Sequence, residues 1–154
     1  MKALKDYEEL FELLNRAKVK YLVVGAYAVG FYAQPRFTGD IDIFVECSKR
    51  NATRLLTAIE KFGFKNVGIE KTDFETPGKI VQLGYPPFRI DLITEIDGVS
   101  FRSAWKNRIK DAFGKHEVYY ISKEDLIRNK RTTARARDLF DLELLGYRKR
   151  ERNK

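Results

Sequence analysis

Three aspartates carry the side chains in this sequence that are best suited to metal chemistry: Asp40 and Asp42, which are separated by one residue, and Asp91. Side chains two residues apart in a strand point to the same side, so the first two carboxylates project together. Two adjacent carboxylates resist joint ionisation unless a cation lies between them. Their oxygens suit Mg²⁺, which typically binds one or two carboxylates together with substrate phosphates. The spacing therefore predicts a metal site.

Asp91 strengthens this prediction because it interrupts an apolar alternating segment. It faces away from its neighbours Ile90 and Leu92, which alternate toward the other side of the strand. If this strand lies beside the one that carries the aspartate pair, three carboxylates converge on one patch. Such a triad can hold two metal ions, and Asp91 can also take the proton from an attacking hydroxyl.

Two simpler interpretations are open for these residues. Asp40 and Asp42 follow a Thr-Gly turn and are also what a solvated strand start would contain. Asp91 can form a structural ion pair with Arg89, which lies two residues away on the same face of the strand.

A phosphate-binding turn is predicted just before the aspartate pair. Residues 21–24 form an apolar run, typical of a buried strand, that ends at Gly25. A short apolar helix is expected over residues 26–33, before Pro35 stops it. A strand that opens into a helix in this way presents backbone N–H groups to an anion, and the helix N-terminus favours phosphate.

The order of these features resembles the nucleotidyltransferase superfamily related to DNA polymerase β, and most closely its minimal members, the kanamycin-type and abortive-infection-toxin-type enzymes. The signature of that superfamily is a hydrophobic strand, Gly-Gly or Gly-Ser, a short helix, Asp-x-Asp and a third carboxylate in a later strand. The matching residues lie at 24–28, 35–43 and 91, and segments 121–127 and 137–142 resemble C-terminal helices of the small members. The resemblance covers about residues 18–146.

The resemblance implies metal-dependent transfer of a nucleoside monophosphate from an NTP to an acceptor hydroxyl, with release of pyrophosphate. Two Mg²⁺ ions are expected, and the acceptor is left open between a small molecule, a protein and a tRNA end. The implied roles are metal ligands at Asp40, Asp42 and Asp91, with Asp91 also the base; a triphosphate cradle at Gly25 and Ala26; and cationic phosphate contacts at Arg36 and Lys130.

Ala26 departs from the signature, which usually has glycine or serine at this position. A missing serine hydroxyl removes a hydrogen bond to a charged group, worth about 1.5–3 kcal/mol, but leaves the backbone N–H in place. The alternative function is a catalytically weak nucleotide-binding or antitoxin-like partner protein with the same fold. For Arg36 and Lys130, the alternative is an ordinary surface charge.

Hydrophobic periodicity predicts the elements that position these residues. Helices are expected over residues 4–17, 26–33, 50–62, from 122 through 127, and 139–145; strands are expected at 21–24, 40–45, 67–69, 80–83, 88–94 and 117–121. Ser122 is the expected N-cap of the helix that follows it. The fold class is therefore α+β (or α/β), a small mixed sheet with helices packed on it, in one domain over residues 1–146 with a charged tail at 147–154.

The charge distribution limits the remaining function classes. Residues 1–101 hold 14 Lys/Arg and 14 Asp/Glu, whereas residues 102–154 hold 16 and 8, so the net charge of 16 − 8 = +8 lies in the last third. The excess positive charge of this last third has three possible explanations: solvated helix faces, contacts to a polyphosphate, or a nucleic-acid-binding module. Interleaved acids favour the first two. Asp138 and Asp141 are interpreted as helix-surface partners of nearby arginines.

Other classes are excluded by what the sequence contains. Cys47 is alone, which excludes an internal disulfide and a zinc site built on several thiolates. Uncharged apolar runs are too short to span a membrane, and acids occupy the N-terminus where a secretory signal would be apolar. We therefore expect a cytoplasmic protein without a membrane segment, in which a homodimer or a partner protein completes the acceptor site.

Overall fold

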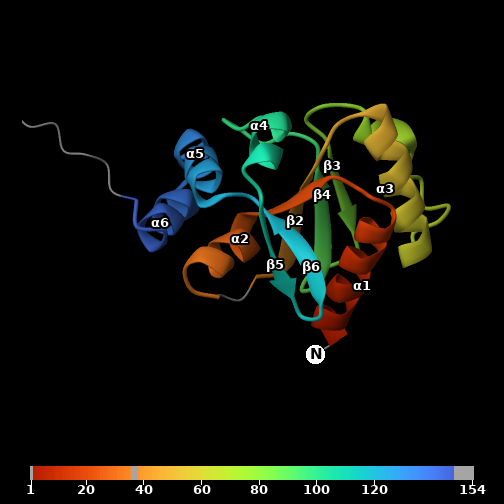
Figure 1. Cartoon of the computed structure of the whole chain (residues 1–154), viewed down its shortest axis with the longest axis horizontal. Helices are drawn as coiled ribbons and strands as arrows, with labels where there is room; N and C mark the ends of the chain where they lie inside the picture. The colour runs from red at the N-terminus through yellow and green to blue at the C-terminus, as the bar shows by residue number, and fades with distance from the viewer. Residues whose placement is uncertain (1, 36–37, 148–154) are drawn as a thin grey trace, which may run out of the picture.

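The computed structural model describes residues 2–35 and 38–147, which form a mixed sheet with helices on both faces (Figure 1). Its strands are β1 (Tyr21–Val24), β2 (Asp40–Val45), β3 (Ile80–Leu83), β4 (Arg89–Ile93), β5 (Ile109–Phe113) and β6 (His116–Tyr120). They lie in the order β3-β4-β2-β1-β6-β5. The β2–β4 and β1–β6 pairs are parallel and the other three pairs are antiparallel. The expected α+β class with a small mixed sheet is confirmed.

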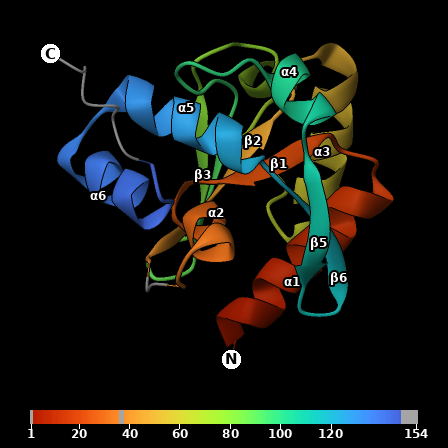
Figure 2. The ribbon, with the colours of Figure 1, turned by 60° about the vertical axis from the view of Figure 1, so that its left-hand side comes forward.

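The helices divide between the two faces of the sheet. They are α1 (Lys2–Arg16), α2 (Gly25–Tyr32), α3 (Lys49–Phe62), α4 (Phe101–Lys106), α5 (Lys123–Thr133) and α6 (Ala136–Leu144), together with the 3₁₀ turn η1 (Lys71–Phe74). Figures 1 and 2 show α1 and α3 on one side of the sheet and α5 and α6 on the other. None of the described helices combines the length and the apolar character that crossing a membrane requires.

Side-chain alternation in the central strands decides what each face carries. In β2, Ile41 and Ile43 are fully buried in the core that α1 and α3 cover. Phe44 faces the opposite way and packs in a second cluster with residues of α2, α4 and α5. Asp40 and Asp42 alternate with the isoleucines, so they lie on the face of the sheet toward the C-terminal helices.

Caps and backbone turns fix the ends of the helices near this face. Ser122 Oγ accepts a hydrogen bond from Asp125 N at 3.1 Å, which confirms the predicted N-cap of α5. At its other end α5 stops at Ala134, whose φ of 47° is left-handed and reverses the chain into α6. The corner between the two helices therefore lies within two residues, at Ala134 and Arg135.

Two parts of the sequence prediction are wrong or incomplete. Residues 67–69 do not form a strand; the chain there is irregular, and Phe74 in η1 supplies the buried apolar contact instead. The helix α4 and the strand β5 were not predicted. Four of the five β5 residues are exposed, because β5 is an edge strand, so it lacks the apolar alternation that a sequence prediction needs.

Candidate active site

The three aspartates meet where β2 and β4 run side by side. Asp42 and Asp91 are direct partners in the register of these parallel strands, and Asp40 lies two residues earlier on the same face. One oxygen from each carboxylate lies within 4.8 Å of the other two. The predicted convergence of the three carboxylates is confirmed. Asp91 is buried, at 6% exposure, while Asp40 and Asp42 are half-buried.

Arg89 binds two of these carboxylates. Its Nε donates to Asp91 Oδ1 at 2.8 Å, and its Nη2 donates to Asp91 Oδ2 at 3.0 Å and to Asp40 Oδ2 at 3.1 Å. The ion pair considered from the sequence is therefore present together with the triad and does not replace it. Because one guanidinium offsets only one of three formal charges, the site can still attract a cation.

Asp42 has a raised pKa because of its place in the cluster. Burial, followed by the neighbouring charges of Asp40 and Asp91, raises the pKa of Asp42 to about 7, although Lys130 acts in the opposite direction. A carboxyl with this pKa is partly protonated at neutral pH when no cation is bound. The donor set is made of hard oxygens alone, so it fits a divalent cation such as Mg²⁺.

This raised pKa predicts a pH-dependent stability for the metal-free protein. The folded state binds the Asp42 proton more tightly than the unfolded chain, where the pKa is 3.8. Its contribution is therefore fully present below about pH 3.8 and is lost as pH rises through about 7. Replacing Asp42 with asparagine, which resembles the protonated acid, should raise the free energy of unfolding at pH 8 by on the order of 2–4 kcal/mol, and by less than half as much at pH 5, where only part of the interval between the two pKa values has been crossed. Urea denaturation in EDTA at both pH values measures this, and equal differences at the two pH values would contradict it.

The backbone at Gly25 approaches the triad closely. Val24 is the register partner of Asp42, and α2 begins at the next residue. Gly25 has a φ of +64°, and a Cβ built there would lie 2.3 Å from Asp42 Oδ2. Within the described part of the chain no side chain makes a capping hydrogen bond at this end of α2, so the N–H groups of its first turn are available to an anion beside the carboxylates.

These groups line a cleft of about 1000 Å³ between the sheet and the C-terminal helices. Gly25, Ala26 and the three aspartates line it on the side of the sheet. The opposite wall is polar and comes from α5, α6 and the corner between them: Asn129, Lys130, Thr132, Thr133, Arg135 and Arg137. A ligand in this cleft meets carboxylates on one side and cations on the other. That arrangement suits a metal-bound polyphosphate.

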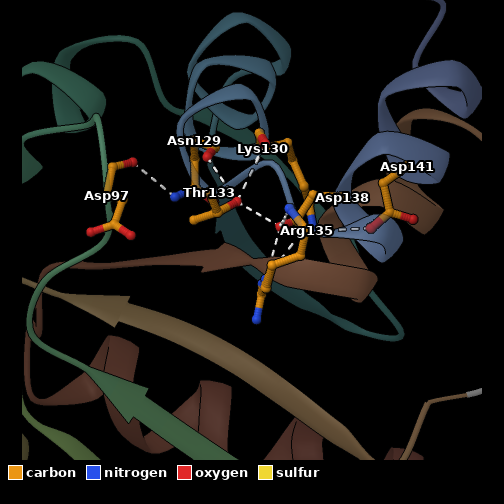
Figure 3. Close-up of polar contacts among 7 residues, drawn as sticks. All are labelled: Asp97, Asn129, Lys130, Thr133, Arg135, Asp138 and Asp141. Carbon is orange, nitrogen blue, oxygen red and sulfur yellow. Dashed lines mark hydrogen bonds and ion pairs between the residues drawn. The ribbon is translucent and has the colours of Figure 1, made fainter.

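Lys130 lines the cleft but is only 5% exposed. Its Nζ lies 3.0 Å from Asp141 Oδ2 and 3.4 Å from Asp138 Oδ1 (Figure 3). Its ammonium therefore faces two carboxylates of α6. The interpretation of Lys130 as an ordinary surface charge is wrong. Arg36, the other predicted cationic contact, lies outside the described residues.

The interpretation of Asp138 and Asp141 as helix-surface residues is also wrong, since both have 0% exposure. A signal for this was present in the sequence. Asp138, Asp141, Leu142 and Leu145 have the spacing i, i+3, i+4, i+7, which places them on one stripe of the helix. Acids on an apolar stripe are buried acids and need partners. Arg135 and Arg137 are the nearby arginines that the sequence interpretation paired with these acids on the helix surface. They were therefore missed as cleft residues.

Comparison with known proteins agrees with the site. No curated protein matches the sequence. The model of the family described as "Nucleotidyl transferase of unknown function (DUF2204)" matches residues 3–153. This match covers both walls of the cleft, and the chain belongs to this nucleotidyltransferase family.

Proposed function

We propose that this protein is a Mg²⁺-dependent nucleotidyltransferase that moves a nucleoside monophosphate from an NTP to an acceptor hydroxyl and releases pyrophosphate. The observation that carries the proposal is the meeting of three aspartates beside the open N-terminus of α2. The family match supports the class of reaction. The convergence of oxygen ligands supports the metal.

The residues have the following proposed roles. Asp40, Asp42 and Asp91 would hold two Mg²⁺ ions, whose chemistry would be to neutralise phosphate charge. The N–H groups of Gly25 and Ala26 donate to phosphate oxygens. The acceptor oxygen forms a bond to the α-phosphorus, the bond from that phosphorus to the leaving pyrophosphate breaks, and Asp91 takes the acceptor proton. Burial raises the pKa of Asp91, which favours this, although the Arg89 hydrogen bonds oppose it.

The cationic wall would hold the triphosphate. Arg135 and Arg137 are exposed residues that line the cleft, so their charges are accessible to a ligand. Lys130 contributes its charge from beneath this wall, and a direct bond from it to phosphate would require it to leave Asp138 or Asp141. The acceptor can be a small molecule, a protein or a tRNA end, and a second copy or a partner protein can help to bind it.

A second candidate is a nucleotide-binding or antitoxin-like protein with little turnover, and Ala26 favours it because the serine hydroxyl of related sites is missing. The two candidates are separated by calorimetric titration of Mg²⁺–ATP together with a pyrophosphate-release assay on a panel of acceptors. Binding with release supports the transferase. Binding without release on every acceptor supports the second candidate, and no binding contradicts both.

Arg89 should compete with metal in the absence of nucleotide, because its guanidinium holds two of the three carboxylates. Replacing Arg89 with glutamine is expected to strengthen Mn²⁺ binding by the free protein by roughly tenfold. Electron paramagnetic resonance of unbound Mn²⁺ measures this. Arg16→Gln is the matched control, because Arg16 is an exposed residue of α1 and loses the same charge. Equal affinities in the two variants would show that Arg89 does not compete.

A further inference from the structure

Asp138 is a fully buried acid, and both of its carboxylate oxygens contact residues at or near the corner between α5 and α6. Oδ2 accepts from Thr133 Oγ1 at 2.7 Å, from Arg135 N at 3.0 Å and from Arg135 Nε at 2.8 Å. Oδ1 accepts from Arg135 Nη2 at 3.3 Å and lies 3.4 Å from Lys130 Nζ. Figure 3 shows these contacts gathered around one carboxylate.

Arg135 is fixed by this carboxylate and is nevertheless accessible. Its side chain keeps 60% exposure while two of its guanidinium nitrogens donate to Asp138. Figure 3 shows the side chain extending from the corner toward the strands, across from Asp97, and both residues line the cleft. An exposed arginine normally samples many rotamers, and ordering it costs free energy on binding. Here the hydrogen bonds to Asp138 already order the Arg135 side chain without a ligand, so binding does not carry this entropic cost.

Capping of α6 explains only part of the arrangement. The bond from Arg135 N to Asp138 is the half of a capping box in which the third helical residue accepts from the N-cap backbone, and a neutral amide at this position can also accept it. A buried carboxylate carries a desolvation cost that a neutral cap avoids, and buried ion pairs are weak contributors to stability. Burial disfavours the ionised form of Asp138, but the hydrogen bonds from Arg135 and Thr133 and the Lys130 charge hold its pKa below the usual range. The negative charge of Asp138 therefore pairs with Lys130 and Arg135, in addition to accepting the hydrogen bond at the start of α6.

We propose that Asp138 is a positioning residue for phosphate binding: it holds the Arg135 guanidinium on the cleft wall opposite Asp42, where it receives a terminal phosphate of the NTP. This inference rests on the proposed function. The ligand class it names is a polyphosphate carried by a divalent cation, since the wall is cationic and the floor is a carboxylate triad.

A double-mutant cycle tests this coupling. The variants are Asp138→Asn, Arg135→Gln and their combination, and the readout is the dissociation constant of a nonhydrolysable ATP analogue with Mg²⁺. Each single change should weaken binding roughly tenfold. The double variant should bind no more weakly than Arg135→Gln alone, because Asp138 acts through Arg135. With Arg137→Gln as the control partner, the two losses should multiply, since Arg137 is a separate cation of the same wall.

Because Arg135 donates to Asp138 from two nitrogens of one guanidinium, a variant at Arg135 can test the contact while the buried acid stays in place. Arg135→Lys keeps the charge but cannot donate from two fixed nitrogens, so it should still bind the analogue at least about fivefold more weakly. Wild-type affinity in Arg135→Lys or in Asp138→Asn overturns the inference and leaves the proposed function standing. Losses that multiply in the Asp138/Arg135 double variant also overturn it. A wild-type protein that does not bind the analogue overturns both.

Discussion

Replacing Asp42 with asparagine should abolish nucleotidyl transfer while leaving the protein folded. Asp42 is the central carboxylate of the triad, with Asp91 as its register partner and Asp40 two residues away on its own strand. Its replacement removes one of the three proposed metal ligands and a negative charge that bound cations would balance. We expect transfer from labelled NTP to fall by roughly a thousandfold.

The stability of this variant separates lost chemistry from lost structure. In the metal-free protein at pH 8, asparagine removes the cost of ionising a carboxyl whose pKa is raised to about 7, so Asp42→Asn should unfold at a higher urea concentration than the wild type. Asp111→Asn is the control, because Asp111 is an exposed residue of the edge strand β5. Wild-type transfer by Asp42→Asn would sink the assignment of the triad.

The central fold could be predicted because its strands alternate or are wholly apolar. Residues 21–24, 40–45 and 80–83 match the observed β1, β2 and β3, and the helix after Gly25 begins where the glycine places it. The failures have a common cause. β5 pairs only with β6 and is largely exposed, so backbone hydrogen bonds form it without an apolar pattern. The segment 67–69 has the composition of a strand but no partner strand.

The candidate site divides along the same line. The carboxylate floor was predictable because its residues lie on strands with a period of two, which fixes the face each one occupies. The opposite wall was predictable only in part. The helical stripe that contains Asp138 and Asp141 indicates buried acids, and Leu139 and Phe140 between them are exposed, at 53% and 55%. Which cations these acids bind depends on the corner of two residues between α5 and α6, and the sequence pattern does not give its geometry.

The two sides of the cleft also account for the uneven distribution of charge along the sequence. The zero net charge of the first 101 residues includes three carboxylates that cluster at one site. Part of the excess in the last third, at Lys130, Arg135 and Arg137, stands across the cleft from them. The segregation of charge along the chain therefore becomes a separation across the cleft. That supports polyphosphate binding more directly than a nucleic-acid-binding surface.

Gly25→Ala should disable the proposed metal site through Asp42. Gly25 has a φ of +64°, which costs an L-residue about 1–2 kcal/mol, and the added Cβ would lie 2.3 Å from Asp42 Oδ2. The carboxylate must move, so we expect Mn²⁺ binding and nucleotidyl transfer to be lost. Gly68→Ala is the matched control, because Gly68 has a φ of +84° and nothing within 4 Å of its added Cβ.

The steric part of this effect is separable from the backbone part. Both glycine variants share the cost of a left-handed residue, so any stability lost by Gly25→Ala beyond Gly68→Ala measures the collision with Asp42. In an Asp42→Ala background the two nearest colliding atoms, Oδ2 and Cγ, are absent and only Cβ remains, at 3.1 Å, so most of the excess should disappear in urea denaturation. If the excess persists there, Gly25 serves another contact. If Gly25→Ala binds Mn²⁺ as Gly68→Ala does, the close approach of the α2 backbone to the triad has no part in holding the metal.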